Sequence, residues 1–424
     1  MITKKVPGVF LLLLICLVGS LVWGGSEELV PLRGSRDDRA IRAFSPRDSV
    51  MIIPVQSCEG RITVEKFVVT RGQPTIRQRQ GNLLPIGQND LPVFSLLDES
   101  GKVLYQTAFG FPVARTVPLP MDGTVDGVPD VVPISDPEMY LVVPYYKEAR
   151  FIDIYYPYEN TPGFSSDLQI LDGYYIKNPP RAEITEPSPV ENISMTSATS
   201  NFYVLIIASG YTSGQMTTFN TRANNLKTYL LSKSPFSNYA ANIVINKYGN
   251  TSSLGCYCGC AGIARLMCCN STKVLNAAAA SGYQYDEIIV LHNTSTYCGG
   301  GYRDNNDSYK GSSYNTYCMI YSGTYYKSMG LHEFGHSFGN LCDEYSYGSE
   351  GYDYYPCVNC RASCSDWSPI SPTCQLGCDA RTYYYRPDNS IMLTLSTEYF
   401  NNVSIQATYS PDGLNKRLDY FTNR

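Results

Sequence analysis

Residues 331–345 read Leu-His-Glu-Phe-Gly-His-Ser-Phe-Gly-Asn-Leu-Cys-Asp-Glu-Tyr and contain the pattern HExxH. On a helix, His332 and His336 lie on one face with their Cβ atoms about 5–6 Å apart, so both imidazoles reach a single ion. Glu333 lies beside them, where it can take a proton from a zinc-bound water. The chain has only 3 histidines, and two of them are in this motif. The motif therefore predicts a catalytic site with one zinc ion.

The residues after this helix supply candidates for the third protein ligand of the zinc ion. Gly339 ends the helix and lets the chain turn back toward the metal. In the metzincin arrangement the third ligand follows that glycine by three residues, and here the position is Cys342. A thiolate binds zinc well, but a ligand role for Cys342 leaves another cysteine unpaired. We predict Asp343 as the third ligand, with Glu344 and Cys342 as the alternatives.

Other residues are candidates for supporting roles at this site. Residues 387–392 (PDNSIM) resemble a Met-turn, in which Met392 forms an apolar floor beneath the zinc ligands; the alternative is an ordinary core methionine. Tyr345 and Tyr399 are candidate hydrogen-bond donors to the transition state. His292 ends a predicted strand, and a hydrogen-bonded core histidine is favoured there over a zinc ligand.

The N-terminus has the features of a secretory signal peptide, which we assign to residues 1–25. Lys4 and Lys5 precede an apolar run over residues 9–22, and small residues follow it. The run is short for a membrane span, and no stop-transfer pattern follows it. We predict an extracellular, secreted protein without membrane contact beyond this targeting step; an uncleaved anchor is the alternative.

Cysteines, sequons and charge support an exported enzyme. Of the 15 cysteines, Cys16 lies inside the apolar run, and the remaining even number predicts about seven disulfides. Cysteine clusters are favoured as disulfides over a second metal site. The net charge is −5 and the pI is about 5.4, and the absence of a basic patch argues against a nucleic-acid partner. The N-x-S/T sequons of a glycoprotein start at Asn192, Asn250, Asn270, Asn293, Asn306 and Asn402.

The length and patterning of the chain predict two folded domains. Residues 26–57 lack periodicity and are interpreted as a lead-in or pro-segment. Residues 58–180 show short strands with Pro and Gly between them, which predicts a β-sandwich. Residues 181–200 are rich in Pro, Ser and Thr, as in a linker. Residues 201–424 form the predicted catalytic domain.

The catalytic domain is predicted to alternate strands and helices in an α/β layer. The predicted strands are residues 202–208, 243–248 and 286–291, and the predicted helices are residues 215–231, 273–280 and 326–339. Residues 299–301 are interpreted as a glycine-rich turn that either borders the substrate groove or only joins two strands. Leu331, Phe334 and Phe338 form the core-facing stripe of the last helix.

The segment HEFGHSFGNLCDEY, preceded by FYVLIIASGYTSGQMTTF and DEIIVLHNTSTYCGGG, resembles the IgA-peptidase family of zinc metalloendopeptidases, with its HExGHxxxxLxDEY signature. The resemblance covers roughly residues 60–420 and is strongest over residues 200–345. It implies His332 and His336 as zinc ligands, Glu333 as the catalytic base and Asp343 as the third ligand. Cys342 and the cysteine-dense insertions depart from the family pattern, and nothing in the sequence supports immunoglobulin A as the substrate.

Together these features predict a multidomain fold, with an N-terminal β-sandwich followed by a zincin-like α/β metallopeptidase domain. The predicted function is that of a secreted zinc endopeptidase, which cleaves a protein or peptide substrate with a zinc-bound water activated by Glu333. The alternative is a secreted, cysteine-rich adhesion or wall glycoprotein on an inactive peptidase fold. Such a fold has no need of Glu333 and both histidines, so the enzyme is favoured. The sequence predicts no oligomeric state.

Overall fold

The computed structural model describes most of the chain from residue 49 onward. The described residues are 49–58, 61–64, 68–71, 93–109, 114–116, 131–133, 138–146, 148–155, 165–166, 201–303, 309, 316–345, 357–367, 370–371, 373–379, 381–407 and 412–423. The predicted signal peptide, most of the predicted lead-in and the predicted linker at 181–200 lie outside these residues. The division of the chain into domains therefore stays a prediction.

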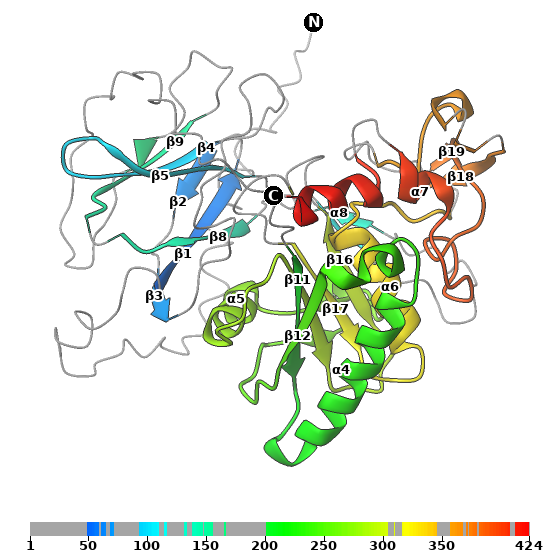
Figure 1. Cartoon of the computed structure of the whole chain (residues 1–424), viewed down its shortest axis with the longest axis horizontal. Helices are drawn as coiled ribbons and strands as arrows, with labels where there is room; N and C mark the ends of the chain where they lie inside the picture. Colours follow the sequence, from blue (N-terminus) through cyan, green and yellow to red (C-terminus); the bar gives the residue numbers. More distant parts are fainter. Residues whose placement is uncertain are drawn as a thin grey trace, which may run out of the picture. The chain divides into compact units, whose positions relative to one another are not determined.

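A mixed seven-stranded sheet carries the fold, in the order β12-β11-β15-β17-β16-β6-β7 (Figure 1). Its strands are β6 (Ala114–Thr116), β7 (Val131–Pro133), β11 (Phe202–Ser209), β12 (Ile243–Tyr248), β15 (Glu287–His292), β16 (Gly299–Arg303) and β17 (Tyr317–Tyr321). Strands β12, β11, β15 and β17 are parallel, whereas β16 is antiparallel to β17. Strand β11 is apolar along nearly its whole length, as expected for a strand that is buried on both faces.

Helices cover both faces of this sheet: α4 (Met216–Leu231), α5 (Ser271–Ala280) and α6 (Tyr326–Ser337). Gly330 of α6 lies against Leu226 of α4 and Ile320 of β17, so α4 and α6 share one face. Tyr317 lies three residues before Ile320 on β17, so its side chain points to the other face, because side chains alternate along a strand. Its hydroxyl lies 2.8 Å from that of Ser271 at the start of α5, which places α5 on the opposite face.

The other elements of residues 201–423 are short. They are β13 (Tyr257–Cys258), β14 (Met267–Cys268), β18 (Gln375–Cys378), β19 (Arg381–Arg386), α7 (Asn402–Gln406) and α8 (Leu414–Thr422), with 3-10 turns at Ser213–Gln215, Phe236–Asn242, Cys260–Gly262 and Cys364–Trp367. None of the helices in the described part of the chain combines the length and the apolar character that a membrane span requires.

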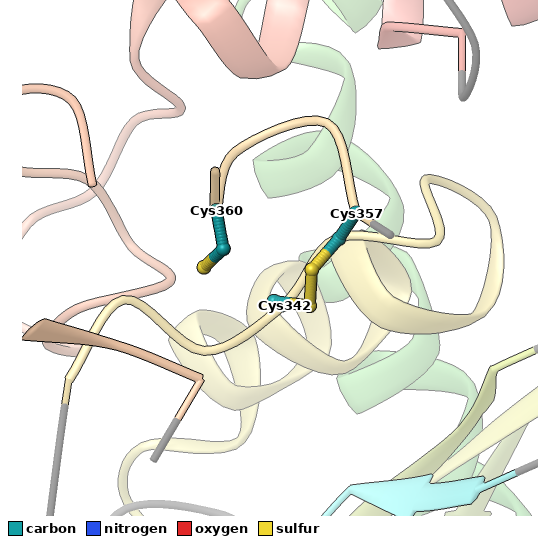
Figure 2. A group of neighbouring side chains, drawn as sticks. All are labelled: Cys342, Cys357 and Cys360. Atoms are coloured by element: carbon teal, nitrogen blue, oxygen red, sulfur yellow. A yellow bond between two sulfur atoms is a disulfide. The ribbon is translucent and has the colours of Figure 1, made fainter. Parts of the chain in front are cut away.

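The described residues contain six disulfides. The pairs are Cys256–Cys269, Cys258–Cys298, Cys260–Cys268, Cys342–Cys357, Cys360–Cys378 and Cys364–Cys374. Figure 2 shows the bond between Cys342 and Cys357, with Cys360 beside it. Cys318 differs from the prediction of fully paired cysteines, because it is a buried free thiol. It lies on the central strand β17, enclosed by the core and away from the loops that carry the disulfides.

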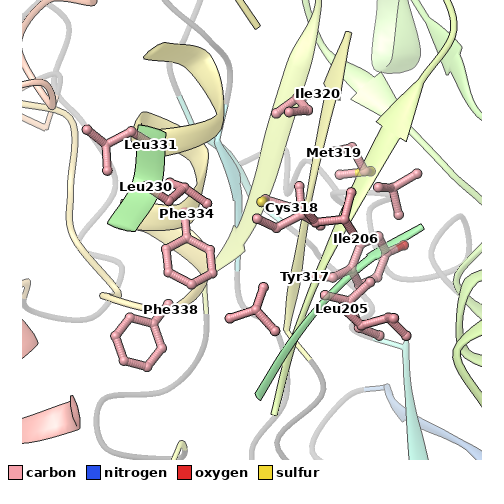
Figure 3. Packing of buried hydrophobic residues seen from close by; sticks show 14 of the residues in the cluster. Leu205, Ile206, Leu230, Tyr317, Cys318, Met319, Ile320, Leu331, Phe334 and Phe338 are labelled. Carbon is pink, nitrogen blue, oxygen red and sulfur yellow. The ribbon is translucent and has the colours of Figure 1, made fainter. Parts of the chain in front are cut away.

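The core forms where α6 packs on the sheet (Figure 3). Leu331, Phe334 and Phe338 are all buried in the central hydrophobic cluster, as their spacing predicts. The ring of Phe338 lies 4.6 Å from that of Phe202 in β11, and it stacks on Phe334 at 5.4 Å. The stripe holds α6 against the parallel strands, so the other positions of the helix are free to carry polar groups.

The glycine run at 299–301 was predicted as a turn, and this prediction is wrong. Gly299 and Gly301 belong to strand β16 and face α6. A Cβ atom on Gly301 would lie 2.9 Å from the backbone oxygen of Glu333 and 3.0 Å from the Cβ of His336, and one on Gly299 would lie 3.2 Å from the Glu333 carboxylate. Glycine in a strand marks such a close backbone approach. The run therefore lets the motif helix rest directly on the strand.

Two further sheets, both antiparallel, lie earlier in the chain. One contains β1 (Ser49–Cys58), β2 (Arg61–Val64), β3 (Val68–Arg71) and β8 (Glu138–Pro144), and the other contains β4 (Val93–Leu97), β5 (Val103–Ala108), β9 (Phe151–Tyr155) and β10 (Ser165–Ser166). Buried side chains of both sheets, such as Ile53 and Phe94, share one hydrophobic cluster. A β-sandwich stays a prediction for this region. Strands β6 and β7, which fall inside the predicted sandwich, belong to the seven-stranded sheet instead.

We predict that Gly301→Ala destabilises the fold by about 1–3 kcal/mol, because the new methyl group has no space between β16 and the backbone of α6. Urea unfolding, followed by circular dichroism, measures this change. Gly214→Ala is the control, since a Cβ atom there meets nothing within 4 Å. Equal stability of Gly301→Ala and the parent would show that α6 does not rest on this strand as described.

Candidate metal centre

The two motif histidines face one point from successive turns of α6. Their Nε2 atoms are 3.1 Å apart, and both side chains are fully buried. The Nδ1 of His332 lies 2.9 Å from the carbonyl oxygen of Ile391, and the Nδ1 of His336 lies 2.7 Å from that of Leu341. A carbonyl oxygen only accepts hydrogen bonds, so each Nδ1 carries the proton. In the neutral rings the two Nε2 lone pairs are then directed at the same place.

Asp343 completes this group from the loop after the helix. Its Oδ1 is 3.2 Å from the Nε2 of His332 and 3.3 Å from the Nε2 of His336. The carboxylate is fully buried, and no described residue donates a hydrogen bond to either oxygen in favourable geometry. Three potential ligand atoms of these residues lie within 4.8 Å of one another.

This arrangement fits a metal cation. Two imidazole lone pairs and an anionic oxygen repel one another at these distances unless a positive charge lies between them. Two histidines with a carboxylate form a donor set of the catalytic zinc type, which leaves one position for water or substrate. The backbone carbonyls on both Nδ1 atoms fix the ring orientations, as outer partners of metal-bound histidines do.

Without a metal, a proton takes the place of this charge. Burial lowers the pKa of His332, but the adjacent carboxylate of Asp343 outweighs it and raises the pKa to about 9. Burial lowers the pKa of His336, which leaves this second ring neutral. Burial raises the pKa of Asp343, yet the two imidazoles hold it well below its usual range. At neutral pH the centre thus contains one imidazolium paired with one carboxylate.

Glu333 lies on α6 between these histidines in sequence and is fully buried. Its carboxylate lies over β16, where the missing Cβ atoms of Gly299 and Gly301 leave room for it. The motif histidines and Glu333 are therefore enclosed by β16 on one side and by the loops containing Leu341 and Ile391 on the other. A carboxylate beside a metal-bound water is placed to accept its proton.

Comparison with known families identifies the segment that carries this centre. Residues 192–362 match the model of the IgA peptidase M64 family. The matched segment is thus similar to a family of metallopeptidases, which supports the resemblance found in the sequence. The match includes the motif helix, Asp343 and the strands beneath them, whereas most of the disulfide-rich segment at 357–378 lies beyond it. No curated protein matches the chain.

In the structure, the two alternatives to Asp343 have other partners. Cys342 is bonded to Cys357, so its sulfur is not a thiolate. Glu344 points away from the histidines and accepts hydrogen bonds from Asn359, Ser390 and Asn401. Burial raises the pKa of Glu344 to about 7, although these hydrogen bonds act in the opposite direction.

Three cysteines that lie close together do not form a second metal site in the described structure. The sulfur atoms of Cys342, Cys357 and Cys360 lie close together, as zinc ligands would (Figure 2). Disulfides to Cys357 and Cys378 use all of them, and a disulfide sulfur is not a thiolate ligand.

The other predicted site residues lie at different places relative to the motif helix and the metal centre. Met392 is fully buried, and its sulfur would be 2.7 Å from a Cβ atom on Gly335, which places it against the turn of α6 between the histidines. Tyr345 is buried, whereas the side chain of Tyr399 is 54 % exposed. His292 lies outside the centre, with its Nδ1 3.1 Å from the hydroxyl of Ser209, and burial lowers its pKa.

Sequence reasoning missed two residues near the centre. Burial, followed by the negative charge of Glu333 and a smaller effect of Asp343, raises the pKa of Tyr297. The only signal in the sequence is that Tyr297 comes directly before the cysteine and glycines that lead into β16. Asn359, within the segment beyond the motif, bonds to both neighbours of Asp343. One asparagine in a loop gives no sequence signal for this role.

We predict that His332 titrates near pH 9 in the metal-free protein. Its raised pKa stabilises the fold fully below pH 6.5, and this contribution is lost as the pH rises through about 9. Nuclear magnetic resonance of histidine-labelled protein measures the titration directly, because the chain has only 3 histidines.

Asp343→Asn is the matched variant for this measurement, since it removes the charge and keeps the shape. The pKa of His332 is expected to fall in this variant, because burial is then opposed only by the charge of Glu333 and the carbonyl of Ile391. Zinc is expected to abolish the titration of both motif histidines in the parent. If all the histidines of the parent titrate at or below pH 6.5, the described ion pair is absent.

Proposed function

We propose that the protein is a secreted, zinc-dependent endopeptidase. The observation that carries this proposal is the convergence of His332, His336 and Asp343 beside the buried Glu333, in a segment that is similar to a metallopeptidase family. His332, His336 and Asp343 would hold the metal. Zinc bound there would lower the pKa of a coordinated water to about 7 and polarise a substrate carbonyl.

In this proposal the protein's own side chains carry out the proton transfers. Glu333 accepts the proton of the attacking water and passes it to the leaving amine of the cleaved peptide bond. Its enclosure between α6 and β16 keeps the carboxylate oriented for both steps. Tyr345 is the buried candidate for a hydrogen-bond donor to the developing charge, and Tyr399 the exposed one. Met392 is proposed as the apolar floor.

The wider architecture and localisation are part of the same proposal. We take the two sheets of residues 49–166 as a β-sandwich, because their buried side chains share one hydrophobic cluster. Six disulfides support an extracellular protein, since disulfides persist in oxidising compartments. The N-terminal apolar run and the sequons support export and glycosylation.

The alternative function is a cysteine-rich adhesion or wall glycoprotein on an inactive peptidase fold. Such a protein needs the fold and its disulfides, but it needs neither a buried carboxylate base nor an arranged set of ligands. Glu333 is fully buried, and removing a carboxylate from water costs free energy. A function at this site accounts for that cost. The enzyme is therefore the better supported of the two.

We predict that Glu333→Gln lowers the cleavage of denatured casein by roughly 10²–10⁴-fold, because the amide cannot accept a proton. The zinc content is expected to stay near one ion per chain, since Glu333 is not among the grouped ligands. Peptide release is measured alongside metal analysis, before and after treatment with a chelator.

Glu99→Gln is the control for this substitution, because Glu99 is exposed and lies in the N-terminal region. It is expected to match the parent in activity and zinc content. Zinc in the parent without any cleavage would favour the adhesion glycoprotein. An oxidised, folded parent that binds no zinc would overturn the proposed function.

A further inference from the structure

The backbone on either side of Asp343 is held by one buried amide side chain. The N–H of Cys342 donates to the Oδ1 of Asn359 at 2.9 Å. The Nδ2 of Asn359 donates to the carbonyl oxygen of Cys342 at 2.8 Å and to the Oε1 of Glu344 at 3.0 Å. Asn359 thus binds both polar groups of the residue before Asp343 and the side chain of the residue after it.

Asn359 is itself fixed by covalent bonds on both sides. It lies in the short loop between Cys357 and Cys360 and is fully buried. Cys357 is bonded to Cys342 (Figure 2), and Cys360 is bonded to Cys378. Because both ends of the loop are cross-linked, the amide group of Asn359 is held where the backbone of Cys342 requires it.

The rest of the loop has matching supports. The carbonyl oxygen of Asp343 accepts a hydrogen bond from the N–H of Asp379 at 2.8 Å, and the N–H of Glu344 donates to the carbonyl oxygen of Met392 at 2.9 Å. Within the described part of the chain, the Asp343 carboxylate has no comparable support and faces only the two imidazoles. The position of its oxygens is therefore set by the backbone that Asn359 holds.

The same hydrogen-bond network extends to the loop that orients His332. Glu344 also accepts hydrogen bonds from Asn401 at 2.6 Å and from Ser390 at 2.7 Å. Ser390 is followed by Ile391, whose carbonyl oxygen fixes the ring of His332. Asn359 and Glu344 thus connect the loop of Asp343 with the loop that orients His332.

We propose that Asn359 is a positioning residue that presents Asp343 to the metal. This inference rests on the proposed function, because it takes Asp343 as a zinc ligand. Partners that orient a ligand contribute roughly 10–100-fold to metal affinity in proteins. Without the amide, the N–H and the carbonyl oxygen of Cys342 both lose their partner on Asn359. The backbone then no longer fixes the position of the Asp343 carboxylate relative to the imidazoles.

The test measures the metal affinity of Asn359→Ala and of the milder Asn359→Ser, neither of which spans the Cys342 peptide group. Both variants are expected to bind zinc roughly 10–100-fold more weakly than the parent, in competition with a chromophoric chelator. Cobalt(II) replaces zinc as a spectroscopic probe, because its visible absorption depends on the coordination geometry. The cobalt spectrum of each variant is expected to differ from that of the parent.

Asn250 supplies a matched control. It is also buried, and its side chain likewise bonds to backbone groups, with Nδ2 near the oxygens of Ala208 and Ser252 and Oδ1 near the N–H of Ser252. Asn250→Ala and Asn250→Ser, made in a host that adds no N-glycans, suffer the same chemical loss outside the metal centre. They are expected to lower the unfolding temperature of the metal-free protein and to leave zinc affinity and the cobalt spectrum unchanged.

The outcomes separate this inference from the proposed function. A parent that binds no zinc would overturn the proposed function. A parent that binds zinc, together with Asn359 variants that keep six disulfides and bind zinc within twofold of it, would overturn only the positioning role. Equal losses of zinc affinity in the Asn250 and Asn359 variants would also overturn it, because the effect would then come from general destabilisation.

Discussion

The described structure is organised around a buried electrostatic conflict. Two imidazole nitrogens and a carboxylate oxygen lie within 3.1–3.3 Å of one another, away from water. Such a cluster is unfavourable unless a cation compensates it. The surrounding parts keep the atoms together: α6 supplies the histidines, β16 supports the helix, and two loops bind the outer ring nitrogens. The hydrophobic core stabilises the fold, and the polar loops hold the three ligand residues close together despite their repulsion.

The elements with strong local patterns could be predicted from the sequence. The apolar run of β11, the spacing of Leu331, Phe334 and Phe338, and the HExxH motif give the central strands and the motif helix. Strand β17 has only five residues, Tyr-Cys-Met-Ile-Tyr, and so short an apolar run does not by itself distinguish a strand from a buried helix segment. The glycines of β16 resemble a turn in isolation, because only the presence of α6 explains why a side chain is excluded there.

The candidate site divides in the same way. Spacing along one helix places His332, Glu333 and His336, so the sequence alone predicts their proximity. The choice among Cys342, Asp343 and Glu344 depends on partners far along the chain, such as Cys357, Ser390 and Asn401. Local sequence contains none of this information. Asn359 is invisible for the same reason, since its function depends on which peptide group lies opposite its amide.

The cross-linked loop around Asn359 has a consequence for the timing of assembly. The spacing of the histidines and Glu333 is set within α6, which contains no cysteine. The loop that holds Asp343 needs the bonds Cys342–Cys357 and Cys360–Cys378, and these form only where the surroundings are oxidising. A newly made chain in a reducing compartment would thus have the three ligand residues without the disulfides that hold the loop of Asp343. Disulfide formation would then delay completion of the proposed hydrolytic centre until the chain has left the compartment in which it was synthesised.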